Sequence, residues 1–154
     1  MTVSAAVIGL GHIGSRFDEE PGRATVWSHV GAYRECADMI RLVAAAEPLE
    51  GNRAAFHDRC PDVPVMVDAA ELFEQARPDV VSICTPSNTH YYYISECIKQ
   101  NINIFCEKPF IINTTNDILN TRLILDNIKN NKLKISVNTQ WVYGIYSLIN
   151  YFNI

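Results

Sequence analysis

The sequence predicts an α/β fold of the doubly wound type, with a mainly parallel sheet and helices on both faces. Two observations predict it. Short apolar runs rich in β-branched residues alternate with longer stretches of helical spacing, and this alternation is typical of β-α-β units. The runs are apolar on both sides, as in strands that helices cover from above and below. Crossovers between such strands are right-handed.

The first elements follow from apolar runs and helix caps. Residues 2–8 form an apolar run that ends at Gly9 and predict the first strand. Ser28 is a good N-cap, which predicts a short helix at 28–35. Residues 40–46 are the second strand, since this apolar run stops at a Glu-Pro pair.

The same alternation continues to the end of the chain. Helices are expected where the sequence is polar on one side and capped by Ser, Thr or Asn, and strands where it is apolar and stopped by a proline pair. The remaining elements are a helix at 49–59, a strand at 63–67, a helix at 69–75, a strand at 79–84, a helix at 88–100, a strand at 102–106, a helix at 114–130, a strand at 133–137 and the start of a helix at 144–154.

Composition excludes several classes. A chain of 154 residues is about one domain long, and its net charge of −4 comes without a basic stripe, so nucleic acid is not an expected partner. No apolar run approaches the roughly 20 residues of a membrane span, and the N-terminus does not resemble a signal peptide, so we expect a cytoplasmic location. The five cysteines are an odd number without Cys-x-x-Cys spacing, which favours reduced, mostly buried thiols and no metal site.

A Gly-x-Gly-x-x-Gly motif follows the first predicted strand. Gly9 allows the tight turn, Gly11 lets a pyrophosphate approach the main chain, and Gly14 allows close packing. The position after an N-terminal strand favours a dinucleotide site over a merely tight turn.

Glu47 ends the second predicted strand, where a carboxylate accepts hydrogen bonds from ribose hydroxyls and repels a 2′-phosphate. It favours NAD over NADP, although Arg53 keeps NADP open. The 33 residues from Gly14 to Glu47 exceed the usual spacing of about 20. We attribute the excess to an insertion at roughly 16–25. The alternative is a solvated glutamate.

Three further polar segments follow predicted strands and are expected at the same edge of the sheet. His90 closes Thr-Pro-Ser-Asn-Thr-His at 85–90, with a first-turn residue without a ligand as the alternative. Lys108, between Glu107 and Pro109, is placed to assist proton loss from a substrate hydroxyl, and Glu107 to hold it; a surface ion pair is the alternative. The amide of Gln140 is placed to touch nicotinamide or substrate, unless 138–141 is only a polar connection.

Together these segments resemble the Gfo/Idh/MocA family of oxidoreductases, which includes glucose–fructose oxidoreductase and inositol dehydrogenase. The resemblance rests on GLGHIG at 9–14, SHVGAYREC at 28–36, PDVVSICTPSNTHYYY at 78–93 and CEKPF at 106–110. The order and spacing of TPxxxH and EKP are specific to it. It implies a Rossmann-type fold, a nicotinamide cofactor, and oxidation or reduction of a hydroxyl on a sugar, cyclitol or sugar nucleotide.

The resemblance also implies site residues. Lys108 would be the catalytic residue, in contact with cofactor and substrate, and Glu107 and Pro109 would fix its loop. The cofactor-binding residues, with Gln140 added from its place after the last strand, would be Gly9, Gly11, His12, Ile13, Gly14, Glu47, Thr85, Pro86, Ser87, His90, Glu107, Lys108, Pro109 and Gln140. Glu47 stands where Asp is commoner in the family, and the arginine that many members carry after the last strand is absent.

The resemblance covers only the N-terminal half of a full-length member. We expect residues 1–140 to be an NAD(P)-binding Rossmann domain and 141–154 to begin the connection to an absent substrate domain. Positioning of the substrate supplies about 7–11 kcal/mol of a barrier, so a truncated chain is expected to be weakly active or inactive alone. The alternatives are a stand-alone NAD(H)-binding or sensing module, a subunit of a split enzyme, or a fold that binds no ligand; a homo-oligomer stays open.

Overall fold

A computed structural model of the chain describes residues 2–22, 25–110 and 115–138, with the side chains of the last segment from Thr121 onward. Six parallel strands form one sheet in the order β3-β2-β1-β4-β5-β6. Their bounds are Val3–Ile8 (β1), Ile40–Ala46 (β2), Val65–Met66 (β3), Val80–Ile83 (β4), Asn103–Glu107 (β5) and Ile135–Asn138 (β6). The predicted doubly wound fold is confirmed.

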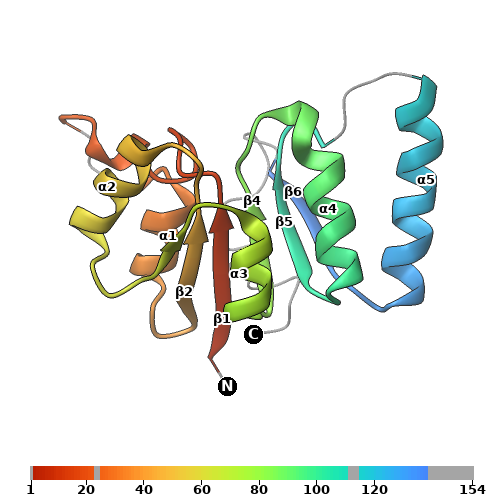
Figure 1. The fold of residues 1–154 in the computed structure, drawn as a ribbon, viewed down its shortest axis with the longest axis horizontal. Helices are drawn as coiled ribbons and strands as arrows, with labels where there is room; N and C mark the ends of the chain where they lie inside the picture. The colour runs from red at the N-terminus through yellow and green to blue at the C-terminus, as the bar shows by residue number, and fades with distance from the viewer. Residues whose placement is uncertain (1, 23–24, 111–114, 139–154) are drawn as a thin grey trace.

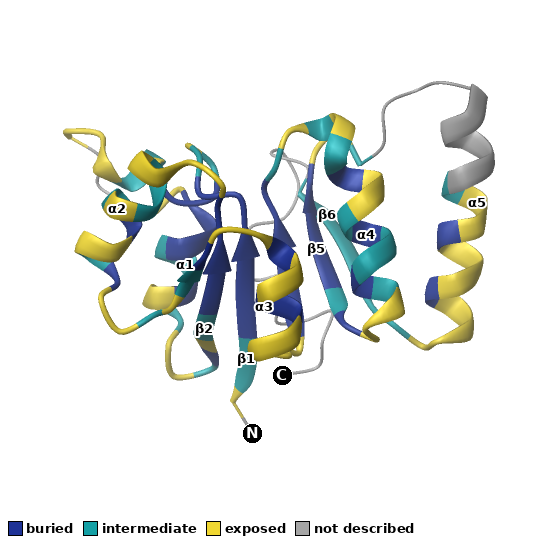
Figure 2. Ribbon diagram, viewed as in Figure 1, coloured by how far each residue is buried: buried dark blue, intermediate teal, exposed yellow. Residues whose placement is uncertain are grey.

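Helices cover both faces of this sheet (Figure 1). Their bounds are His29–Glu35 (α1), Glu50–Arg59 (α2), Ala69–Gln75 (α3), His90–Lys99 (α4) and Thr115–Asn130 (α5), with 3-10 turns at Arg16–Glu19 (η1) and Ser87–Thr89 (η2). One apolar cluster joins α1 and α2 to the sheet, and a second joins α3, α4 and α5 to it. Figure 2 shows the consequence: the central strands are buried and the outer sides of the helices are exposed.

Some predicted elements begin or end elsewhere. The strand expected at 63–67 is only Val65–Met66, and the helix expected from residue 88 begins at His90, because 87–89 form a 3-10 turn. The strand expected at 133–137 is Ile135–Asn138. The predicted helix at 144–154 lies outside the described residues.

The five cysteines are free thiols and four of them are buried, which confirms the predicted burial. Burial, with help from the charge of Glu107, raises the pKa of the Cys106 thiol to about 12. None of the described helices combines the length and hydrophobicity that crossing a bilayer requires.

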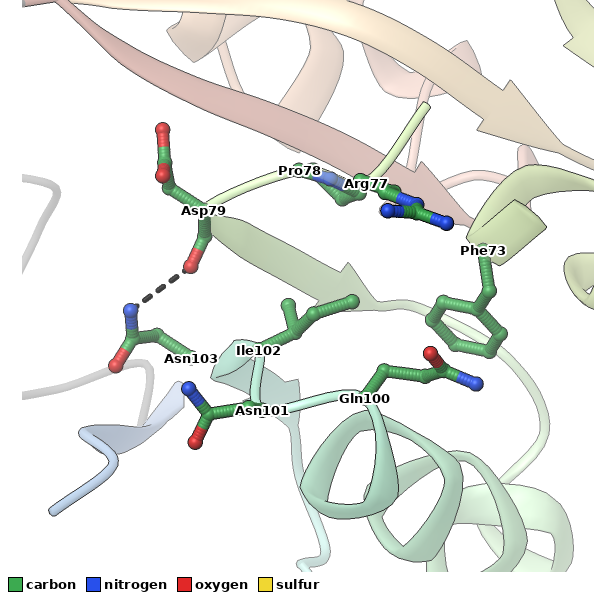
Figure 3. A pocket seen from close by; sticks show the side chains of 8 residues that line it. All are labelled: Phe73, Arg77, Pro78, Asp79, Gln100, Asn101, Ile102 and Asn103. Atoms are coloured by element: carbon green, nitrogen blue, oxygen red, sulfur yellow. Dashed lines mark hydrogen bonds between the residues drawn. The ribbon is translucent and has the colours of Figure 1, made fainter. Parts of the chain in front are cut away.

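A cavity of about 460 Å³ lies at the amino ends of β4 and β5 (Figure 3). Two of the polar residues that line it are engaged within the protein. Asp79 accepts from the amide and hydroxyl of Ser4, and Asn103 donates to the carbonyl oxygen of Asp79 and accepts from the amide of Lys134. The opposite edge of the sheet, where the strands end, is therefore the place to look for a site.

Candidate functional site

A cleft of about 630 Å³ lies at the carboxyl ends of β1, β2 and β4. The chain runs from β1 outward to β2 and β3, then returns across the sheet to β4, so the direction of winding reverses here. Ligands of doubly wound sheets bind at such a switch point. Of the predicted site residues, those that line the cleft are Gly9, Gly11, Glu47, Thr85 and Pro86.

The glycine turn between β1 and the helical segment needs glycine at two positions for different reasons. Gly9 has φ +91°, and a Cβ there would lie 2.8 Å from main-chain atoms of Cys84. A Cβ at Gly14 would overlap the carbonyl oxygen of Gly9. Gly11 is different, because a Cβ there would meet nothing within 4 Å. The structure leaves open space in front of Gly11, on the wall of the cleft.

The main-chain amides of residues 11–14 form an arrangement that suits an anion. Across residues 2–22, 25–110 and 115–138 no acceptor is found for the amides of residues 11–14. The carbonyl oxygens of Gly11 and His12 accept from the amides of Ser15 and Phe17, so the segment forms a helical turn. Consecutive unbonded amides at the start of such a turn favour a phosphate group.

Glu47 is buried at the end of β2, with 5% of its surface exposed. One carboxylate oxygen accepts from the amide of Leu10 over 2.7 Å and the other from the amide of Leu49 over 2.9 Å. A carboxylate has about four acceptor positions, so about two remain. The side chain therefore ties the glycine turn to β2 and still offers acceptors to a ligand.

Arg53, the residue that kept a 2′-phosphate open, is engaged with the main chain. Its Nη1 donates to the carbonyl oxygens of Glu47 and Pro48 over 2.8 and 2.7 Å. This geometry turns the guanidinium group to the end of β2, where it supports the position of Glu47.

The segment after β4 contributes in two ways. Thr85 and Pro86 line the cleft, and the hydroxyl of Thr89 lies 2.7 Å from the hydroxyl of Thr85. His90 is fully buried, with Nε2 2.9 Å from the carbonyl oxygen of Thr85 and Nδ1 2.9 Å from that of Pro109. The structure thus places His90 behind the loops rather than on the wall of the cleft.

Glu107 ends β5 beneath the exposed Lys108. Its carboxylate accepts from Nδ2 of Asn138 over 2.6 Å and lies 2.9 Å from Nε2 of His29. Toward Lys108 it accepts from the main-chain amide over 3.2 Å, which differs from the expected hold on the ammonium group. Burial alone would raise the pKa of Glu107, but hydrogen bonds from His29 and Asn138 lower it below its ordinary value.

This contact extends into a buried chain of polar side chains between α1 and the strands β4 and β5. Nδ1 of His29 lies 2.9 Å from the hydroxyl of Ser82, which lies 2.7 Å from the hydroxyl of Tyr33. Sequence reasoning missed these three residues. The one available signal was a polar serine inside the apolar run of β4, because a buried polar group needs a partner. Gln140 lies outside the described residues.

The charged residues 18–20 belong to the predicted insertion, and the first of them has a structural role. Asp18 accepts from the amides of Trp27 and Ser28 and from the Ser28 hydroxyl, so it holds the start of α1. Gly31 leaves room for this carboxylate, since a Cβ there would overlap it. Asp18 therefore secures the chain where α1 begins.

Comparison with known proteins agrees with this geometry. A family model for Gfo/Idh/MocA, described as an oxidoreductase family with an NAD-binding Rossmann fold, matches residues 3–138. Myo-inositol 2-dehydrogenase from Thermotoga maritima is 29% identical over 107 residues, which are 70% of this chain and 28% of that protein. The chain thus spans about a quarter of the length of this curated relative.

Solved structures share the fold at low identity. The WlbA dehydrogenase from Bordetella pertussis, in complex with NADH and UDP-GlcNAcA, has a TM-score of 0.72 and 16% identity, over 90% of this chain and 37% of that one. Scyllo-inositol dehydrogenase from Lactobacillus casei, with NAD(H) and scyllo-inositol, has a TM-score of 0.68 and 19% identity, over 90% and 36%.

Proposed function

Because the chain belongs to the Gfo/Idh/MocA family of oxidoreductases and carries its NAD-binding Rossmann fold, we propose that residues 1–140 are the cofactor-binding part of a dehydrogenase. In this proposal the cleft at the ends of β1, β2 and β4 holds NAD. The reaction is the oxidation or reduction of a hydroxyl group on a sugar-like substrate.

One observation carries the proposal. Four consecutive amides, those of residues 11–14, have no acceptor in the described parts of the chain, and open space lies in front of Gly11. These features fit a pyrophosphate, because its oxygens supply the missing acceptors and need close approach to the main chain. His12 and Ile13 contribute through their amides, whereas Gly9 and Gly14 act by shaping the turn.

The adenosine end is proposed to lie against Glu47. The remaining acceptor positions of the carboxylate suit the ribose hydroxyls, and its negative charge opposes a 2′-phosphate. Arg53, which donates to main-chain carbonyl oxygens, does not offset that charge for a phosphate. This arrangement favours NAD over NADP.

The nicotinamide end is proposed to lie near Thr85, Pro86 and the loop of Lys108. Bound nicotinamide would supply the hydride acceptor or donor. The ammonium group of Lys108 would donate a hydrogen bond to the substrate hydroxyl and stabilise it as its proton leaves. Relatives solved with scyllo-inositol and with UDP-GlcNAcA support a polyol or sugar as substrate.

Titration of the chain with NADH and with NADPH, followed by nicotinamide fluorescence, tests the proposal. We expect saturable NADH binding and weaker NADPH binding. If the folded chain binds neither nucleotide, the proposal is wrong. Equal binding of both would retain the site and overturn the role of Glu47.

A further inference from the structure

Lys108 is exposed, but each residue beside it is held by a buried histidine. Before it, the carboxylate of Glu107 lies 2.9 Å from Nε2 of His29. After it, the carbonyl oxygen of Pro109 lies 2.9 Å from Nδ1 of His90. The two histidines are 6% and 0% exposed, and they reach the lysine loop through different neighbours.

The second nitrogen of each ring is anchored to β4 or to the loop that follows it. Nδ1 of His29 lies 2.9 Å from the hydroxyl of Ser82 in β4. Nε2 of His90 lies 2.9 Å from the carbonyl oxygen of Thr85, just after β4. Both rings therefore bridge from β4 to the lysine loop.

The bridges come from opposite faces of the sheet. His29 begins α1, which packs with α2 on one face, and His90 begins α4, which packs with α3 and α5 on the other. When the residues before and after Lys108 are both held by contacts, the main chain of Lys108 itself has little conformational freedom. A functional side chain needs such support to stay within about 0.5 Å of its working position.

We propose that His29 and His90 are positioning residues that hold the main chain of Lys108 over the cofactor cleft. They act through Glu107 and Pro109 and touch neither cofactor nor substrate. The proposal rests on the function proposed above for Lys108. The competing interpretation is that both rings are only packed core residues.

Hydrogen-bond chemistry separates the two interpretations. An asparagine side chain brings its NH₂ group near the position of histidine Nδ1, and a glutamine brings it near Nε2. His29 reaches Glu107 through Nε2, so H29Q keeps that bridge and H29N loses it. His90 reaches Pro109 through Nδ1, so the order reverses: H90N keeps the bridge and H90Q loses it.

The experiment follows the Lys108 side chain directly. The chain has five lysines, so ¹³C-methylation gives few side-chain signals by NMR, and K108R identifies that of Lys108. Signals are recorded with and without NADH for H29N, H29Q, H90N and H90Q, with NADH affinity and thermal midpoint for each. The exposed His57 supplies matched controls, H57N and H57Q.

In H29N and H90Q we expect the Lys108 signal to shift and to narrow, as for a more mobile side chain. NADH should bind about fivefold more weakly to these two variants, as for the loss of one hydrogen bond. H29Q and H90N should stay close to the wild type. The proposal is overturned if the effects of Asn and Gln rank in the same order at both histidines. It is also overturned if the Lys108 signal is the same in all four variants as in the wild type. A third outcome is that the Asn and Gln variants rank in opposite orders at positions 29 and 90 while the Lys108 signal does not respond to NADH. That result would support the positioning role of the two histidines and refute the function proposed for Lys108.

Discussion

The main-chain amide of His29 donates a hydrogen bond to the carbonyl oxygen of Ile13 over 3.0 Å, and the amide of Val30 bonds to Gly14 in the same way. In an uninterrupted α-helix the oxygen of Ile13 would accept from residue 17, twelve positions before His29. The helical turn that begins at the glycine motif is therefore interrupted by twelve residues. After them, α1 continues the same helical register.

This register explains the spacing between the glycine motif and Glu47. Without the twelve additional residues, the 33 positions from Gly14 to Glu47 become 21, close to the roughly 20 of dinucleotide-binding units. The register supports the insertion expected at roughly 16–25 and extends it to residue 27. This corrected spacing supports the ribose-binding role proposed for Glu47.

The first prediction contrasts two glycines of the turn. G11A should keep the thermal midpoint of the wild type, because its Cβ meets no protein atom, and should lose most NADH affinity, because the methyl group lies where the pyrophosphate approaches. G14A should instead destabilise the fold by about 3 kcal/mol, since its Cβ overlaps Gly9. Thermal unfolding and NADH titration of both proteins measure this.

A helical glycine on the surface is the control for that pair. G51A adds a Cβ in open space and should change neither property for the worse. NADH binding by G11A as strong as in the wild type would place the pyrophosphate elsewhere.

The second prediction concerns Glu47. E47Q removes the charge and presents an NH₂ group to one of the two amides that the carboxylate now accepts from. NADH affinity should fall about tenfold, and the preference over NADPH should narrow, because repulsion of the 2′-phosphate is gone. Fluorescence titration with both nucleotides measures this. The exposed Glu50 provides the control E50Q, and an unchanged ratio of the two affinities in E47Q would contradict the role of the charge.

The third prediction concerns pH and Glu107. Its pKa is raised by burial but lowered more by its hydrogen bonds, so it lies below the ordinary 4.5. An acid whose pKa is lower in the folded chain stabilises the fold when ionised. That stabilisation is complete above the ordinary pKa and disappears as pH falls through the lowered one. E107Q should be less stable than the wild type by about 1–3 kcal/mol near neutral pH.

Urea unfolding of both proteins between about pH 7 and about pH 3 measures this difference. The gap should close as the pH falls below the ordinary pKa of the carboxyl group. A gap that is constant across this range would show that the side chain matters by shape and not by charge.

The helices and strands were predictable because each has its own signal in the local sequence. Apolar runs that stop at Gly9 or before Pro86 specify strands, and their alternation with capped helices specifies the winding. The glycine motif and Glu47 were predictable for the same reason, since each directly follows a strand.

The supports of the site were not predictable from local pattern. His29 and Glu107 are 78 residues apart and meet only because β4 lies between β1 and β5 in the sheet. The resemblance placed His90 beside the cofactor, but its burial depends on the fold of the loop after β5, which brings the carbonyl oxygen of Pro109 onto its ring. The role of Asp18 has no local signal either, because its partner, the start of α1, is ten residues away.

The last prediction tests the interrupted helix. Deleting residues 16–27 joins Ser15 to Ser28 and places His29 four positions after Ile13, so both of the observed bonds continue an ordinary α-helix. Loss of the hydrogen bonds that Asp18 accepts at the start of α1 is offset by removal of a loop whose closure costs about 2 kcal/mol. The ion pairs of Glu19 are partly exposed and weak. The free energy of unfolding of the shortened chain should therefore stay within about 2 kcal/mol of that of the wild type, and NADH should bind with similar affinity.

Deleting only 17–27 is the matched control. The one residue more that this deletion leaves turns α1 by about 100° and takes Val30 and Tyr33 out of the core. Circular dichroism melts and NADH titration of both deletions measure this, and equal damage in the two would show that the helix is not resumed in register.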